Sequence, residues 1–440
     1  MVVADALAAA RAPFAPTPAP EWKALAIAAA GLLVTFAAPQ HRPDLLVIGL
    51  VASGIGIAWS PVVGVLLTGA LLPAFFFGRG LVGPLSMAPP GLALLLTWLA
   101  IGLRRRHLRL RWPQSVYNAP LALLLVASLL SLAVTQYPLL SVRELRADIL
   151  EPILFFILLM TWPGTSIWGL VGFLLGATVT AVAAILQAPL GIGGTAVEGV
   201  LRVQAWYPSA NHLALMLGRA LPFLLACAMA SRRWSWIPTA VVGVAMLLTF
   251  STGGWLGALA AVLVVLAALG RRRAAAWVGG GAGLALVAVS ALAILGRLPE
   301  RLNPLRQTGG FRLDLWQSSA EMVRDHPLFG VGLDNFVYLY QQFYLREGAA
   351  AEPSLSHPHN WILNFLLSLG LLGLIAFVWL LVRFCRQAVP RRRRWVVAGA
   401  LGAVADMLVH GFIDNSYFLV DLAFVFWLCL ALAEDRIEST

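Results

Sequence analysis

Long apolar stretches, separated by short polar segments, recur from one end of the chain to the other. About fourteen of them approach the length needed to cross roughly 30 Å of hydrocarbon. They are residues 23–39, 44–60, 62–78, 85–103, 118–135, 149–163, 166–187, 211–230, 236–250, 253–270, 274–296, 360–384, 395–413 and 416–433. Their lack of a period of two is typical of helices rather than of a membrane barrel. The pattern predicts an all-α polytopic membrane protein with about 12–14 transmembrane helices.

These stretches also predict how the chain is divided. We expect a cytoplasmic tail at 1–22, transmembrane helices at 23–296, a large exported loop at 297–359, further transmembrane helices at 360–434 and a second cytoplasmic tail at 435–440. One interruption leaves two alternatives open. Only Ser60-Pro61 divides residues 44–78, so this region is predicted to be either two spans or one re-entrant hairpin.

The positive charges lie in alternate connections between the predicted spans. Arginines gather at 104–111, 232–233, 271–273 and 383–394, in connections without Asp or Glu, which is typical of cytoplasmic loops. We therefore place both termini in the cytoplasm. In a chain that is 60% hydrophobic and 12% charged, the net charge of +11 is an orientation signal, and it does not indicate a nucleic-acid partner. The three cysteines form no CxxC pattern and indicate no metal site.

The large exported loop is expected to be ordered, with helices of its own. Residues 311–325 have apolar positions at helical spacing, and Pro327 ends this segment. A tight turn at 330–336, which contains Asp334, leads to a second amphipathic stretch at 337–344. Such stretches can lie on the membrane surface and cover a cavity between helices.

A histidine cluster stands where this loop enters the next span. The segment His357-Pro358-His359-Asn360 leads directly into an apolar stretch. Imidazoles exchange protons near neutral pH. His359 directly precedes Asn360, a residue type that favours the helix N-cap, whereas Pro358 separates His357 from that helix. The cluster indicates chemistry on a membrane-bound substrate.

Arginines on the exported side are candidates for binding phosphate, because the guanidinium group is a planar donor that stays charged. Most of them are expected to be solvated or paired with nearby acids. Arg312 differs because it starts a helix after two glycines, and Arg202 differs because its loop leads to Asn211 at a span entrance.

Ionisable residues inside the spans are functional candidates because their burial is costly. Arg219 lies about two turns inside a span, and Asp406, His410 and Asp414 recur every four residues. This spacing predicts one polar stripe on one helix face. The stripe either forms an interhelical hydrogen-bond network or contacts the substrate.

Several of these segments together resemble the O-antigen ligase and polymerase family of membrane glycosyltransferases. The shared features are Arg312-x-x-x-Trp316, the run 325–336, His359-Asn360, the small residues Ser368, Gly370 and Gly373, and the closing His410, Asp414-Asn415 and Tyr417. They cover about a quarter of the chain, while the earlier spans resemble the family in hydropathy and around Asn211.

The resemblance implies an inverting enzyme without metal or cofactor, in a bacterial inner membrane, with its active site on the periplasmic face. The donor would be an undecaprenyl-diphosphate-linked glycan, and the acceptor a hydroxyl of lipid A core, of another glycan or of a protein. His359 would be the catalytic base and Arg312 would bind diphosphate. The supporting residues would be His357, Asn360, Asn211, Asp334, His410 and Asp414.

One position departs from the family pattern. Many members carry Ser-Arg-Gly at the start of a middle span, and this chain has Ser251-Thr252-Gly253. The Thr252 hydroxyl can donate to a phosphate oxygen but brings no charge. Either Arg202 or Arg219 is therefore expected to supply a second cation, or this chain handles its donor differently.

Other functions remain open at this point. A ligase and a polymerase share donor and chemistry, so the sequence does not separate them. A bicarbonate-type transporter is a different class, in which Arg219 and the Asp406 stripe would line a path. The lack of an inverted repeat and the gathering of polar groups at the exported face argue against it. A purely structural scaffold would leave the histidine cluster unexplained.

Overall fold

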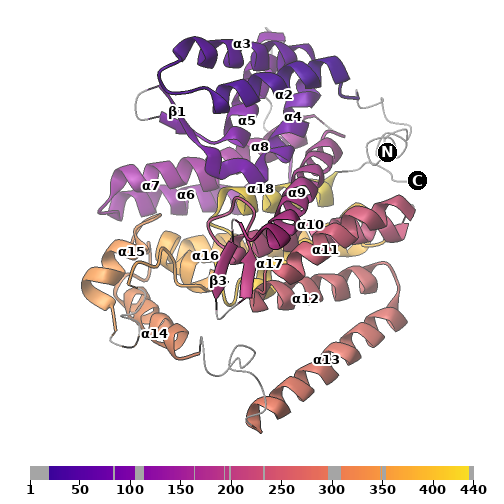
Figure 1. The fold of residues 1–440 in the computed structure, drawn as a ribbon. Coiled ribbons are helices and arrows are strands. Elements are labelled where there is room, and N and C mark those ends of the chain that lie inside the picture. Colours follow the sequence, from indigo (N-terminus) through magenta and orange to yellow (C-terminus); the bar gives the residue numbers. More distant parts are fainter. Residues whose placement is uncertain are drawn as a thin grey trace.

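The computed structural model describes residues 19–82, 85–104, 113–162, 164–192, 194–197, 200–230, 233–295, 309–346, 348 and 353–435. In these residues the chain forms seventeen α-helices, several short 3-10 and π-helical turns and two small hairpins (Figure 1). Most of the predicted tail at 1–22, most of the tail at 435–440 and most of the arginine cluster at 104–111 lie outside the described residues.

Each of the fourteen apolar stretches contains a helix in the structure, which confirms the prediction of an all-helical, multi-pass membrane protein. The corresponding helices are α2 (Trp22–Ala37), α3 (Pro43–Trp59), α4 (Pro61–Ala70), α5 (Pro89–Arg104), α6 (Asn118–Val134), α8 (Glu151–Thr161), α9 (Ser166–Leu190), α10 (Ala210–Ala230), α11 (Trp236–Leu248), α12 (Thr252–Ala268), α13 (Arg272–Ile294), α16 (Trp361–Ala388), α17 (Trp395–His410) and α18 (Val420–Glu434).

Only some of these helices are individually long enough to span a bilayer. By length and apolar composition, three of the described helices qualify, namely α9, α10 and α16 with the turn that follows it. The consecutive helices α3 and α4 would add a fourth span if they count as one, and they are bent by 120° where they meet. Ser60 has an extended backbone before Pro61, as expected for a residue that precedes proline. The bend fits a broken span or a re-entrant segment.

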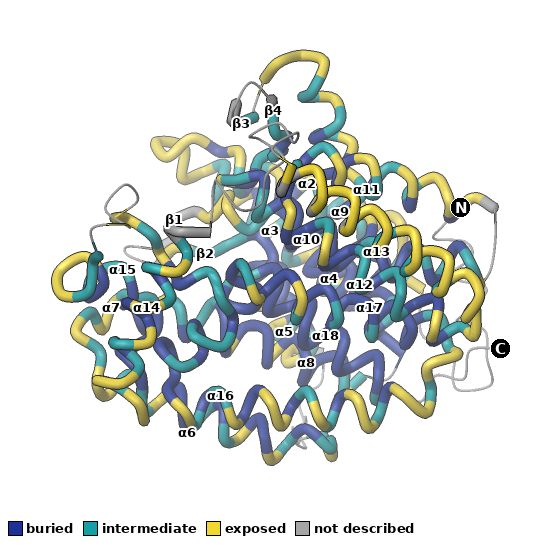
Figure 2. The backbone as a smooth tube through the Cα atoms, turned by 90° about the horizontal axis from the view of Figure 1, so that it is seen from below, coloured by how far each residue is buried: buried dark blue, intermediate teal, exposed yellow. Residues whose placement is uncertain are grey.

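Helices α17 and α18, from the second half of the chain, lie in the interior of the molecule. Residues 421–433 of α18 are buried without interruption, whereas surface helices normally bury one stripe. Figure 2 shows buried segments of α17 and α18 inside a shell of partly exposed helices, and Figure 1 shows α13 at the edge of the molecule, beyond α12. Polar groups on α10, α17 and the α17–α18 connection therefore meet in the interior.

The helices predicted within residues 297–359 are present. They are α14 (Gly309–Asp325), α15 (Phe336–Leu339) and a π-helical turn at Tyr340–Tyr344. The loop docks on α16 where that helix is broken at Gly370, whose φ is +68°. There Leu371 N donates to Pro327 O at 3.1 Å, and Val331 N donates to Leu367 O at 2.7 Å. A side chain at Gly370 would collide with the Leu328 carbonyl, so this close contact requires glycine.

A buried asparagine fixes the other side of the same loop. Asn335 is fully buried, and its Nδ2 donates to Ser141 Oγ at 2.8 Å and to Leu333 O at 2.7 Å. Its Oδ1 accepts from Thr135 Oγ1 at 3.0 Å. Because each polar atom of this side chain is bonded, the turn is tied to the α6–α7 connection, where α7 is Pro138–Glu144.

The sequence did not indicate the two antiparallel hairpins. The first consists of β1 (Arg79–Val82) and β2 (Leu85–Met87), and the second of β3 (Gly194–Val197) and β4 (Val200–Val203). The predicted loop that contains Arg202 and leads to Asn211 thus includes a hairpin, which pairs Arg202 with Thr195. The hairpin holds Arg202 on a short strand just before α10.

Candidate active site

The histidine segment forms a turn that ends in a capped helix. Asn360 Oδ1 accepts from the backbone N–H of Ile362 at 3.0 Å and of Leu363 at 3.2 Å, which confirms the predicted N-cap of α16. His359, one residue earlier, has φ of +48°, a left-handed conformation that costs energy in a non-glycine residue. The surrounding hydrogen bonds therefore hold His359 in a conformation it would not favour alone.

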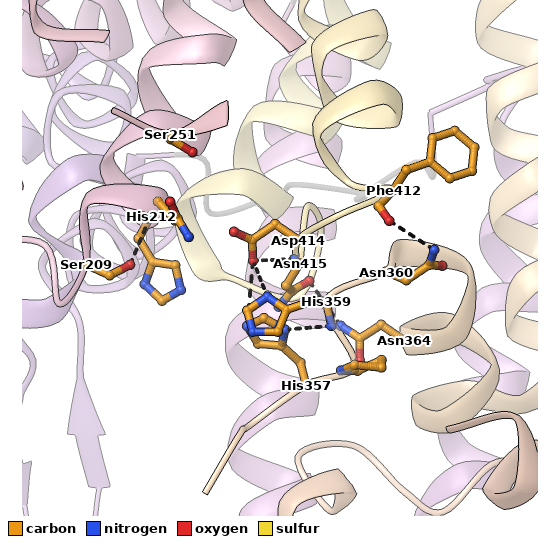
Figure 3. Close-up of polar contacts among 12 residues, drawn as sticks. Ser209, His212, Ser251, His357, His359, Asn360, Asn364, Phe412, Asp414 and Asn415 are labelled. Atoms are coloured by element: carbon orange, nitrogen blue, oxygen red, sulfur yellow. Dashed lines mark hydrogen bonds and ion pairs between the residues drawn. The ribbon is translucent and has the colours of Figure 1, made fainter. Parts of the chain in front are cut away.

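His359 meets a carboxylate from a distant part of the chain. His359 Nδ1 lies 3.0 Å from Asp414 Oδ1, and the Asn415 backbone N–H also donates to this oxygen at 2.8 Å (Figure 3). Two further hydrogen bonds hold the segments together, since Trp361 N donates to Gly411 O and the side-chain Nδ2 of Asn360 donates to Phe412 O. Because a carboxylate only accepts, Nδ1 carries the proton and Nε2 keeps its lone pair.

The environment keeps Asp414 ionised. Burial opposes ionisation of this carboxyl, but the hydrogen bond from His359 and the neighbouring imidazoles outweigh it, so the pKa of Asp414 lies well below its usual range. His357 shows the opposite response. Burial, together with the positive charge that His359 can carry, lowers the pKa of His357 to about 3. His357 is therefore neutral at neutral pH, while Asp414 remains charged beside it.

The cluster contains a possible ligand set for a metal. His357, His359 and Asp414 each offer one ligand atom, and these atoms lie within 4.8 Å of one another. Zinc accepts such ligands. However, His357 Nδ1 accepts from the His359 backbone N–H at 3.2 Å, so the neutral ring carries its proton on Nε2, 4.0 Å from Asp414. A metal bound at His357 Nε2 would need a lone pair on that atom, where the proton lies. The observed hydrogen bonds fit a carboxylate between two N–H groups better than a metal centre.

Arg312 lies in the first turn of α14, and the same helix contacts the histidine turn. Trp316, four residues later on the same helix face, donates from Nε1 to Pro358 O at 3.1 Å. Arg312 is partly exposed and lies within electrostatic range of His410. The helix thus brings Arg312 towards the cluster. Arg324, near the other end of α14, has a side chain that is 81% exposed, 3.7 Å from Asp325.

Arg202 lies beside the position where the family arginine is missing. Its Nη2 donates to Asn211 Oδ1 at 2.6 Å, and its Nε donates to Thr249 O at 2.8 Å, three residues before Thr252. Burial lowers the pKa of Arg202, and the charge of Asp414 opposes that shift, so the guanidinium group lies within electrostatic range of the catalytic candidates.

Arg219 is placed differently from Arg202. It is 2% exposed, forms an ion pair with Asp406 of α17 and donates from Nη2 to Ser416 O at 3.1 Å. Its charge is thus compensated inside the helix bundle. This geometry fits the packing alternative for the polar stripe, because breaking a buried pair is costly.

We expect Arg219→Met alone to destabilise the protein by about 3–5 kcal/mol, because it leaves Asp406 buried without its partner. The double variant Arg219→Met with Asp406→Leu should recover most of that loss. Thermal unfolding in detergent measures stability, and glycan transfer measures function. A double variant that is stable but inactive would instead assign Arg219 to the substrate.

The predicted polar stripe is wrong in one respect. Helix α17 ends at His410, so Asp414 lies in the following connection rather than on the helix face. His410 itself is buried and packs against Gly253. Asp334 faces another part of the protein, where its carboxylate pairs with Arg143 at 2.6 Å. Asp334 and its neighbour Asn335 therefore anchor the loop that carries α14 and α15.

Sequence analysis did not single out His212. Figure 3 shows His212 beside the His359–Asp414 pair, and it lies within electrostatic range of both residues. Its backbone N–H donates to Ser209 Oγ at 3.2 Å at the start of α10. Its position directly after Asn211 was the available signal. Four histidines, at 212, 357, 359 and 410, thus surround Asp414.

Comparisons with known proteins find similarity in the part of the chain that contains the histidine segment. Residues 237–378 match the family model described as O-antigen ligase. A protein of Rickettsia conorii (strain ATCC VR-613 / Malish 7) named "Putative polysaccharide ligase" is 30% identical over 93 residues, and a protein of the same name from Rickettsia felis (strain ATCC VR-1525 / URRWXCal2) is 29% identical over 93 residues. Each match covers 20% of this chain and 23% of the relative.

The chain is therefore similar to the O-antigen ligase family over residues 237–378, and it is similar to these two proteins over 93 residues. The matched segment spans less than a quarter of either relative's length. The region 237–378 contains Thr252, Arg312, His357 and His359, whereas Arg202 and Asp414 lie outside its limits.

Proposed function

We propose, from the similarity of residues 237–378 to the O-antigen ligase family, that this membrane protein is a glycosyltransferase. Its donor is a glycan linked to undecaprenyl diphosphate, and its acceptor is a hydroxyl of lipid A core or of another surface glycan. A protein acceptor is a less favoured alternative. The observation that carries the proposal is the hydrogen bond between His359 Nδ1 and Asp414 Oδ1 at 3.0 Å.

In the proposed reaction, Asp414 orients His359 and stabilises the imidazolium ion that forms. The free Nε2 accepts the proton of the acceptor hydroxyl, whose oxygen attacks the anomeric carbon of the glycan. The bond between that carbon and the diphosphate oxygen breaks, and the electron pair leaves with the diphosphate. Direct displacement inverts the anomeric configuration.

The leaving diphosphate gains negative charge, which two arginines are positioned to stabilise. We assign this role to Arg312 and Arg202. Arg202 bonds to Thr249, three residues before Thr252. It thereby takes the role of the arginine that many family members have at the position of Thr252. Arg219 is left out because the Asp406 carboxylate compensates its charge, whereas the oxygens of Asn211 and Thr249 that Arg202 contacts are neutral. The donor set around His359 supports a reaction that needs no metal.

Purified protein in detergent, supplied with an undecaprenyl-diphosphate oligosaccharide, tests the proposal. We expect glycosylated acceptor and free undecaprenyl diphosphate to form in equal amounts, in the presence of EDTA, with inversion at the anomeric carbon by NMR. A lipopolysaccharide core acceptor tests the ligase, and a second lipid-linked glycan tests the polymerase. No transfer to either, combined with bicarbonate flux in proteoliposomes, would favour a transporter instead.

We also propose that the site faces the periplasm and that both termini are cytoplasmic. In a background without the three cysteines, Ser354→Cys should react with a membrane-impermeant thiol reagent in intact cells, and Arg272→Cys should react only after lysis. Both positions are exposed, so accessibility of the side chain does not limit the test. Labelling of Arg272→Cys from outside would reverse the proposed orientation.

A further inference from the structure

A group of aromatic rings lies next to the candidate active site and takes no part in the proposed reaction. Three consecutive phenylalanines end the 3-10 segment Leu72–Phe77, which follows α4. Phe76 is 36% exposed and Phe77 is 53% exposed. The ring centroid of Phe77 lies 6.3 Å from that of Trp206, in the segment between β4 and α10. We call Phe76, Phe77 and Trp206 the aromatic platform.

Contacts with neighbouring residues hold the rings of the aromatic platform in place. Trp206 Nε1 donates to Pro73 O at 2.6 Å, which joins the 3-10 segment to the segment before α10. Phe76 packs edge-on against Tyr207, with centroids 5.0 Å apart, and Tyr207 is itself fixed by a hydrogen bond of 2.8 Å to Asp421 of α18. The indole N–H is thus bonded within the protein and does not turn to the membrane surface, as it would in an interfacial aromatic belt.

His212 connects the platform to the reaction centre. Its ring is nearly parallel to that of Phe76, at an interplanar angle of 9° with centroids 6.5 Å apart. The same residue lies beside the His359–Asp414 pair in Figure 3, within electrostatic range of both members. Its Nδ1 is shielded from solvent and has no hydrogen-bond partner among the described residues. A buried polar atom of this kind usually finds a partner, and a ligand supplies one here only if the ring turns as the ligand binds.

We propose that Phe76, Phe77, Trp206 and His212 form a subsite for a sugar ring beside the reaction centre. One face of a pyranose ring consists of C–H groups that pack on aromatic rings, while its hydroxyls need hydrogen-bond partners. Rigid aromatic surfaces with a few polar groups are typical of small-molecule sites, and exposed apolar patches of this kind often mark binding. The subsite deepens the proposed function and rests on it. It holds a sugar of either the acceptor or the lipid-linked donor.

Phe77 offers the cleanest test because more than half of its side chain is exposed. We expect Phe77→Ala to raise the KM of one substrate about tenfold while kcat changes little, since the ring stacks without touching reacting atoms. Phe77→Trp should retain activity, and Phe77→Leu, which is apolar but not aromatic, should resemble alanine. The matched control is Phe343→Ala, an aromatic residue of the exported loop that is 69% exposed.

The two substrates are varied separately to identify the sugar. A raised KM for core oligosaccharide acceptor places the acceptor on the platform, and a raised KM for the undecaprenyl-diphosphate donor places the donor there. Unchanged KM values for both, or equal effects in Phe343→Ala, would overturn the subsite. So would full activity of Phe77→Leu, because the contact would then be merely apolar.

Direct binding separates this inference from the proposed function. Core oligosaccharide released from its lipid by mild acid, and repeat-unit oligosaccharide released from its diphosphate, are titrated into purified protein by calorimetry. Binding that weakens about tenfold in Phe77→Ala supports the subsite even if no transfer is detected. If the enzyme is active but Phe77→Ala changes neither its sugar binding nor its KM values, the proposed function stands and the subsite is overturned.

Discussion

Replacement of His359 by alanine is expected to abolish glycan transfer while the protein remains folded and inserted. Loss of a general base typically lowers the rate by about 10²–10⁴-fold, which in cells would look like absence of the product. The side chain is partly exposed and contributes one hydrogen bond to Asp414, so its removal leaves the helix cap at Asn360 intact. Complementation of a deletion strain, with membrane levels checked by blot, measures the effect.

Neighbouring residues supply the controls for His359. His357→Ala should retain measurable activity, because His357 supports the loop through the His359 backbone N–H rather than removing the substrate proton. Asp414→Asn should lose nearly as much activity as His359→Ala, since an amide can hold the imidazole in the wrong tautomer. Wild-type amounts of product from His359→Ala would remove the catalytic base from the mechanism.

Arg312→Ala is expected to reduce the use of the lipid-linked donor far more than Arg324→Ala does. Both arginines lie on α14, but only Arg312 lies on the turn next to Trp316, which contacts the histidine turn. Loss of a charged contact to the leaving diphosphate should cost about 2–4 kcal/mol of transition-state stabilisation, or roughly 30- to 900-fold in kcat/KM. Steady-state kinetics with purified variants provide the measurement.

Arg324→Ala serves as the matched control because it removes the same charge from the same helix at an 81% exposed side chain. Arg202→Ala should show a loss similar to that of Arg312→Ala, whereas Arg202→Lys should recover part of it, since lysine keeps the charge but not the planar fork. Equal and small effects of Arg312→Ala and Arg324→Ala on kcat/KM would show that Arg312 is a surface charge without a role in donor binding.

Much of the secondary structure could be predicted because its causes are local. Apolar length set the positions of the helices, and Asn360 capped α16 where its residue type and position indicated. The end of α17 was predicted three residues too late, at 413, because the apolar composition continues beyond the turn at Gly411. The hairpin of β3 and β4 was missed because four-residue strands leave almost no periodic signal.

The sequence by itself determined the class of protein, the helices and the segment that carries the histidines, because hydropathy and capping act between neighbouring residues. Only the tertiary structure decided which groups act together. It brought Asp414 to His359 across 55 positions, Arg202 to Thr249 across 47, and Arg219 to Asp406 across 187. Arg202 and Arg219 are both arginines near the same span entrance. They differ because Arg202 bonds to Thr249, just before α12, whereas Arg219 pairs with the buried carboxylate of Asp406. The packing of the helices alone sets that difference.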